Sequence, residues 1–146
     1  MAVTQGTTDP AEAFRMVTLT LLADQDYLAL ARTSAMHVGA LVFLPLPRVN
    51  DLRLAVDEVC TSFLQSTEGL EADSAAPAPS RTMELAYDRY PTALHVTVRA
   101  PAPQGWPQRD ELGWAMLETL VAEVRVSLQD GIGVLTLIEP LPTAAG

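Results

Sequence analysis

Glu58 and Ser62 are the residues of this sequence whose types and spacing first indicate chemistry. They stand four positions apart, so a helix would place the carboxylate and the hydroxyl one above the other. A carboxylate held in this way can orient a substrate hydroxyl and take its proton. An ordinary solvated helix face carries the same residue types, so the spacing by itself leaves both interpretations open.

The segment 50–65, NDLRLAVDEVCTSFLQ, must position this pair. We predict an amphipathic helix that Asn50 or Asp51 caps and that Pro45 and Pro47 separate from the preceding chain. Cys60 lies on its apolar stripe, which favours a buried, inert thiol over a redox switch. The stripe consists of Leu52, Ala55, Val56, Val59, Cys60 and Phe63.

Hydrophobic periodicity, together with helix-capping and turn residues, predicts the other elements. Asp24 is expected to cap a helix to about Val38, Asp110 a helix that buries Trp114, and Asp130-Gly131 to close a hairpin. An acidic, Pro-rich segment, 68–80, is predicted to be a loop. Strands are predicted at 17–21, 83–87, 94–98, 124–128 and 132–138.

The resulting order, β-α-α-β-β-α-β-β, predicts an α+β two-layer sandwich. Its helices would cover one face of a mixed, mostly antiparallel sheet. The 146 residues fit one domain, which we place at 15–140, with a flexible N-terminus at 1–14 and a tail at 141–146.

Composition narrows the classes of function. Nine arginines and no lysine stand against eighteen acids, a formal net charge of −9, which argues against direct nucleic-acid binding. The single cysteine fits a reducing cytoplasm. No secretory leader is expected, and the longest apolar run, 39–46, is too short to cross a membrane. His37 and His95 lie on different elements, so we infer no metal site.

The helix motif DLRLAVDEVCTSFLQ resembles the N-box helix of RsbW-type anti-sigma-factor kinases, which belong to the histidine-kinase-like ATPase superfamily. That motif typically reads AVSEACTNAV, and its Glu acts as general base while its Asn holds magnesium. Glu58 stands at the Glu position, and Ser62 replaces the Asn. Actinobacterial anti-sigma factors have a very similar helix that also lacks the Asn. The segment LGWAMLETLVAEVRV carries the resemblance further, and together these motifs imply the ATPase-type sandwich.

Two further nucleotide-binding positions are altered relative to this family. Ala100 and Ala102 stand where relatives carry the Asp and Gly that read adenine. Gly113 is the one glycine left of a phosphate-binding Gly-x-Gly turn, because Glu111 replaces the other. A carboxylate there would repel a phosphate. We therefore predict a degenerate nucleotide site and no cofactor, with residual binding of ATP and Mg²⁺ as the alternative.

The resemblance also implies partners. Arg32, in Ala31-Arg32-Thr33, matches an ARxT pattern that contacts both the sigma factor and its antagonist in related proteins. The alternative is a surface Arg paired with Asp24 or Asp26. Trp106, between prolines, is expected to be exposed and to help an interface.

The first functional hypothesis is therefore a cytoplasmic anti-sigma factor. It would sequester a stress- or development-type sigma factor until an anti-anti-sigma protein of the STAS-domain type releases it, and the family implies a homodimer. The second hypothesis is an active protein serine kinase that phosphorylates the antagonist, with Glu58 as base. The third is a regulatory module that binds another partner.

Overall fold

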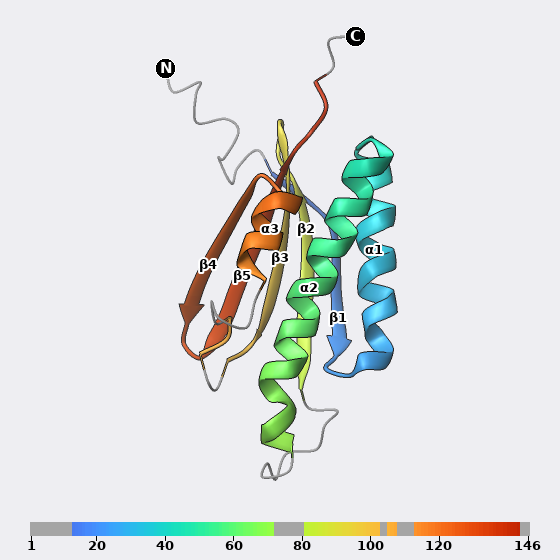
Figure 1. The fold of residues 1–146 in the computed structure, drawn as a ribbon. Helices are drawn as coiled ribbons and strands as arrows, with labels where there is room; N and C mark the ends of the chain where they lie inside the picture. Colours follow the sequence, from blue (N-terminus) through green and yellow to red (C-terminus); the bar gives the residue numbers. More distant parts are fainter. Residues whose placement is uncertain (1–12, 72–80, 103–104, 108–112, 144–146) are drawn as a thin grey trace.

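Three helices lie on one face of a five-stranded sheet, as the sequence predicts (Figure 1). The computed structural model describes residues 13–71, 81–102, 105–107 and 113–143. The sheet order is β1-β2-β3-β5-β4, and every pairing between these strands is antiparallel. The strands are β1 (Phe14–Leu22), β2 (Thr82–Arg89), β3 (Ala93–Pro101), β4 (Glu123–Gln129) and β5 (Ile132–Pro140).

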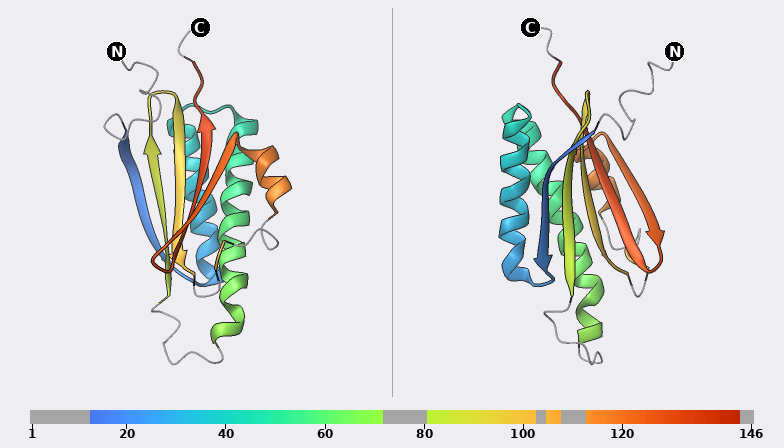
Figure 2. Two further views of the ribbon diagram at one scale, coloured as in Figure 1. Left: turned by 90° about the vertical axis from the view of Figure 1, so that its left-hand side faces the viewer. Right: turned by 180° about the vertical axis from the view of Figure 1, so that it is seen from behind.

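The two long helices, α1 (Leu28–Leu41) and α2 (Leu46–Glu71), form a helical hairpin over the sheet (Figure 2). The short α3 (Trp114–Leu120) lies beside α2. Asp24 caps a single 3₁₀ turn, Gln25–Tyr27, that leads into α1, and its carboxylate accepts the Asp26 N–H at 2.8 Å.

The core lies between the helical hairpin and the inner face of the sheet. Every residue of the predicted α2 stripe is at most 1% exposed. From the sheet, Met83, Leu85 and Tyr87 of β2 point toward the helices, because alternate strand residues share a face. Cys60 is fully buried, which confirms the prediction of a buried thiol, and this burial raises its pKa to about 12.

The start of α2 differs from the prediction. The helix begins at Leu46, so Asn50 and Asp51 lie inside it and cap nothing. Pro47 lies in the first turn, where a missing N–H costs no hydrogen bond. The Pro45 carbonyl accepts the N–H groups of Arg48 at 2.8 Å and Val49 at 3.0 Å. The helix also continues to Glu71, so the predicted loop starts later than expected, and the rest of it lies outside the described residues.

The β4–β5 hairpin closes at Asp130-Gly131, as predicted. Both residues have positive φ angles, 52° and 78°. A two-residue turn needs this conformation at both positions to match the twist of the strands. Asp110, the predicted cap of the last helix, lies outside the described residues.

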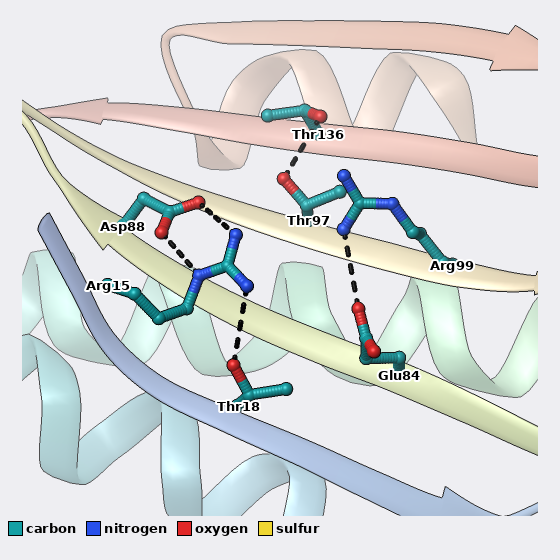
Figure 3. A network of polar contacts seen from close by, with 7 residues as sticks. All are labelled: Arg15, Thr18, Glu84, Asp88, Thr97, Arg99 and Thr136. Carbon is teal, nitrogen blue, oxygen red and sulfur yellow. Dashed lines mark hydrogen bonds and ion pairs between the residues drawn. The ribbon is translucent and has the colours of Figure 1, made fainter. Parts of the chain in front are cut away.

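The sheet face opposite the helices carries a polar cross-strand network (Figure 3). Arg15 of β1 binds both carboxylate oxygens of Asp88 on β2, at 2.5 and 3.2 Å. Arg99 reaches Glu84 at 3.4 Å, and the hydroxyls of Thr97 and Thr136 lie 3.2 Å apart. The Arg15 side chain is 49% exposed, so this pair adds only about 0–1 kcal/mol to stability.

Candidate functional site

Glu58 joins α2 to the start of α3. Its Oε2 accepts a hydrogen bond from the backbone N–H of Gly113 at 3.1 Å. Gly113 is the N-cap residue of α3 and offers no side chain to cap it. A carboxylate at a helix N-terminus satisfies an otherwise unpaired N–H and lies at the positive end of the helix dipole. Glu58 therefore does for α3 what a side-chain cap would do.

Glu58→Ala should accordingly lower the free energy of unfolding by about 0.5–2 kcal/mol, the usual cost of losing a helix cap. Glu58→Gln keeps an acceptor oxygen and should lose less. Urea denaturation of both variants measures the difference. Equal stability of wild type and Glu58→Ala would show that the contact with Gly113 does no capping.

Ser62 does not share a solvated face with Glu58. Its side chain is only 1% exposed, and its Oγ has no hydrogen-bond partner among the described residues. The 26-residue α2 is covered on several sides, so positions that a surface helix would leave polar are buried here. Of the two interpretations left open by the sequence, the ordinary solvated helix face is therefore wrong for Ser62.

Trp106 is the residue that sequence reasoning placed least well. We expected it to be exposed, but it is 1% exposed. Its ring meets Phe63 of α2 edge-on, with centroids 5.3 Å apart and planes at 66°. A Cβ added to Gly133 of β5 would lie 2.2 Å from the Trp106 carbonyl oxygen and 2.6 Å from its Cε3. Trp106 thus fills the space between α2 and β5, and only glycine at position 133 leaves room for it.

Ala100 lies beside this aromatic packing. It is 1% exposed and pairs with Gly133 across the β3–β5 ladder, and Ala102 is also buried. The Ala102 N–H binds the Gly131 carbonyl at 2.8 Å, which ties the end of β3 to the β4–β5 turn. Neither alanine presents a hydrogen-bonding side chain at this edge of the site.

The described contacts join the predicted positions in pairs. Glu58 and Gly113 are in direct contact. Ser62 precedes Phe63, whose ring meets Trp106, and Ala100 of β3 pairs with Gly133, which lies against Trp106. Among the described residues, no three His, Cys, Asp or Glu side chains gather as metal ligands do.

Arg32 lies apart from this group, on α1. Its Nη1 lies 2.8 Å from Oδ1 of Asp57 on α2, and the two side chains are 37% and 34% exposed. The alternative, in which Arg32 pairs with Asp24 or Asp26, is wrong about the partner. Arg32 lies on the side of α1 that faces α2, and it pairs with Asp57 there. The Asp57 contact fixes the Arg32 side chain at the surface of the helical hairpin.

Arg48 and the buried Glu139 carboxylate form a partly buried ion pair that the sequence did not reveal. Arg48 Nε and Nη2 bind the two carboxylate oxygens of Glu139 at 2.7 and 2.6 Å. Arg48 also binds Asp51 at 2.9 Å and the Leu120 carbonyl at 3.1 Å. The hydrogen bonding that Arg48 donates to the Glu139 carboxylate raises the pKa of Arg48. This cluster joins the first turn of α2, the last residue of α3 and the end of β5, which lie far apart in the sequence.

Comparisons with known proteins identify the fold. No family profile and no curated protein matches the sequence. Among solved structures, the RsbU and RsbW domains of Rv1364c from Mycobacterium tuberculosis match with a TM-score of 0.59 and 18% identity, over 89% of this chain and 34% of that one. The SiaB-SiaC complex from Pseudomonas aeruginosa matches with a TM-score of 0.52 and 10% identity, over 87% and 91%.

These likenesses show that the chain has the fold of RsbW-like domains, a two-layer α+β sandwich. The chain spans about a third of the length of the Mycobacterium tuberculosis chain.

Within the described residues, no helix is both long and apolar enough to cross a membrane.

Proposed function

We propose that this protein is an anti-sigma factor that works by binding proteins and not by transferring phosphate. It would hold an alternative sigma factor away from RNA polymerase, and an anti-anti-sigma antagonist would release that sigma factor by competing for an overlapping surface. The sequence motifs of α2 and α3 and the RsbW-like fold support this proposal.

The observation that supports the proposal is that, among the described residues, the positions matched to nucleotide binding are engaged or buried within the chain itself. Glu58 is engaged by the Gly113 N–H, the backbone donor that a phosphate would need at this helix start. Trp106 fills the space between α2 and β5, and Ala100 offers no acceptor to a base. These groups are engaged inside the fold. The outer surface of the helical hairpin is therefore the surface that we assign to partner binding.

Arg32 is the residue that we assign to partner binding. One guanidinium nitrogen is bound to Asp57, and the side chain remains 37% exposed. A guanidinium fixed in this way keeps further donors for a partner carboxylate and loses less freedom when it binds. The proposed contact is a bidentate Arg32–carboxylate pair at the centre of the interface.

Arg32→Glu should therefore weaken capture of the sigma factor by at least about 2 kcal/mol, roughly 30-fold in Kd. The measurement is copurification of sigma factors with tagged protein from the native cell, followed by titration of the purified pair. The double variant Arg32→Glu with Asp57→Arg restores the ion pair between α1 and α2, so it controls for damage to the fold.

If the double variant regains binding, Arg32 acts through the helical hairpin and does not touch the partner. If no sigma factor copurifies with wild type, the chain is a regulatory module with another partner.

One observation favours the alternative, a protein serine kinase with Glu58 as base. The Glu58 carboxylate is held in place by the Gly113 N–H, as a positioned base would be. Transfer of radiolabelled phosphate from ATP to the antagonist, abolished in Glu58→Ala, would establish this alternative.

A further inference from the structure

The three most exposed large apolar side chains among the described residues lie at one end of the molecule. Phe43 and Leu46, at the turn between α1 and α2, are 78% and 76% exposed, and Phe14 at the start of β1 is 59% exposed. Figure 1 shows this turn and the start of β1 at the same end of the fold as the β2–β3 hairpin. Apolar side chains that are exposed together, and not singly, mark interaction sites on soluble proteins.

Phe43 occupies a backbone position that suits glycine. It follows the last residue of α1 by two positions, and its φ is 64°. The Phe43 N–H binds the Ala40 carbonyl at 3.0 Å. The Leu44 N–H binds the Gly39 carbonyl, also at 3.0 Å, and the two bonds form the motif that commonly ends a helix with a glycine.

The side chain of Phe43 is therefore not explained by the fold. A bulky residue with a positive φ is strained, and a ring that is 78% exposed regains little of that cost by packing. Glycine or asparagine at position 43 would suit the turn better. A ring that the fold does not need is available to a partner.

A groove of about 570 Å³ opens beside Phe43. Its walls come from the end of α1, the β2–β3 hairpin and the residues after β5. The Leu141 N–H binds the Thr92 carbonyl at 2.9 Å, which holds the chain after β5 against the hairpin. The groove is as large as sites that enclose small ligands. Its mostly apolar lining includes Val42, Phe43, Pro91, Leu141 and Pro142.

Arg89 is the charged residue in the described lining of this groove. Its guanidinium makes no hydrogen bond or ion pair with any described residue. The preceding residue, Asp88, points to the other face of the sheet, where both its carboxylate oxygens bind Arg15. Other arginines of the chain each bind a carboxylate, namely Arg15, Arg32, Arg48, Arg99 and Arg125. In a chain with a formal net charge of −9, Arg89 is thus an arginine left to attract a carboxylate from another molecule.

We propose that this end of the molecule binds a short segment of a partner protein that carries a carboxylate beside apolar side chains. The carboxylate would bind Arg89, and the apolar side chains would enter the groove beside Phe43. Phe14 stands opposite Arg89 in the β1–β2 ladder, so it extends the apolar surface on the other side of the guanidinium. Aromatic and arginine side chains are those that most often dominate protein interfaces. The net charge of −9 would repel a nucleic acid or an anionic lipid surface.

This surface is separate from Arg32 and from the nucleotide-binding positions. Leu41, at the end of α1 next to it, lies about 13 Å along the helix from Arg32, at about 1.5 Å per residue. Thr92 precedes β3, whereas Ala100 lies near the far end of that strand. The proposal therefore adds a second protein-binding site and does not depend on the anti-sigma function.

Selection from a library of short random peptides displayed on phage, with the full chain as target, tests the proposal. We expect the enriched peptides to share one Asp or Glu flanked by apolar residues, and their synthetic copies to bind in fluorescence-anisotropy titrations. A copy whose acid is changed to the amide should bind about tenfold more weakly. No enrichment, or enrichment of peptides without an acid, would overturn the proposal.

Two variants assign the binding to this surface. Arg89→Glu should weaken binding of the selected peptide at least about tenfold and should prefer a copy in which lysine replaces the acid. A damaged fold would not produce that reversal. Phe43→Asn should weaken binding about tenfold yet melt at or above the wild-type temperature, because asparagine tolerates a positive φ. The matched controls Arg99→Glu, on the open sheet face, and Leu128→Asn, on β4, should bind like wild type.

Peptide binding that survives Arg89→Glu, or that falls equally in Arg99→Glu, would overturn the proposal. So would cosedimentation with phosphatidylcholine vesicles that is lost in Phe43→Asn, because it would assign the surface to a lipid membrane. Arg32→Glu should leave peptide binding unchanged, so a failure of this proposal is distinct from a failure of the anti-sigma proposal.

Discussion

Trp106→Ala is expected to lower the free energy of unfolding by about 3–5 kcal/mol, the usual cost of removing a buried aromatic side chain. Trp106 is 1% exposed and packs edge-on against Phe63, so its loss leaves a cavity that the two surrounding elements, α2 and β5, cannot easily close. Urea denaturation followed by circular dichroism measures the loss. Trp114→Ala is the matched control, because Trp114 is only partly buried and should cost less.

Gly133→Ala tests the same packing from the sheet side. The added Cβ would meet the Trp106 carbonyl oxygen and ring, so the segment that carries Trp106 must move, and we expect a loss comparable to that of Trp106→Ala. The two changes should be strongly non-additive, because a segment freed of its indole can yield to the new methyl group. A stability change below about 1 kcal/mol in both single variants would contradict a filled site.

Arg48→Ala should have the second large effect, about 3 kcal/mol, because it leaves the buried Glu139 carboxylate without its partner. The Glu139 side chain is 4% exposed and receives two hydrogen bonds from Arg48. We expect the low end of the usual range because the Arg48 side chain is 34% exposed.

Arg15→Ala is the control for this second effect. It also removes a two-pronged Arg–carboxylate pair, but on the open sheet face, and should cost at most about 1 kcal/mol. Replacing both Arg48 and Glu139 by apolar residues of similar volume should cost less than Arg48→Ala, since no buried charge remains. Equal losses in Arg48→Ala and Arg15→Ala would show that burial adds nothing to the Arg48–Glu139 pair.

The sequence correctly predicted the elements whose hydrophobic periodicity was unambiguous. The α2 stripe is buried because Leu52 to Phe63 repeats apolar residues at helical spacing. In β2, Met83, Leu85 and Tyr87 alternate with Glu84, Ala86 and Asp88, which is the period of a strand. Asp130-Gly131 predicted its hairpin because few other residues adopt two successive positive φ angles. Asp24 was predicted as a cap for the same kind of local reason.

The features that sequence reasoning missed depend on contacts between distant segments. Arg48 and Glu139 stand 91 positions apart, and no local pattern predicts their pairing. Trp106 was expected at the surface because prolines flank it, although Gly133, far along the chain, makes room for it in the core. One local signal was available, since Pro47 in a first turn is compatible with a helix that begins at Leu46.

Titration of the labelled protein with Mg-ATP, followed by the backbone amide resonances, tests the central claim most directly. If Glu58, Trp106 and Ala100 leave no nucleotide-binding site, the amide signals of Gly113 and its neighbours should not shift at millimolar nucleotide. A saturable shift of the Gly113 amide, as Glu58 gives way to a phosphate, would contradict it.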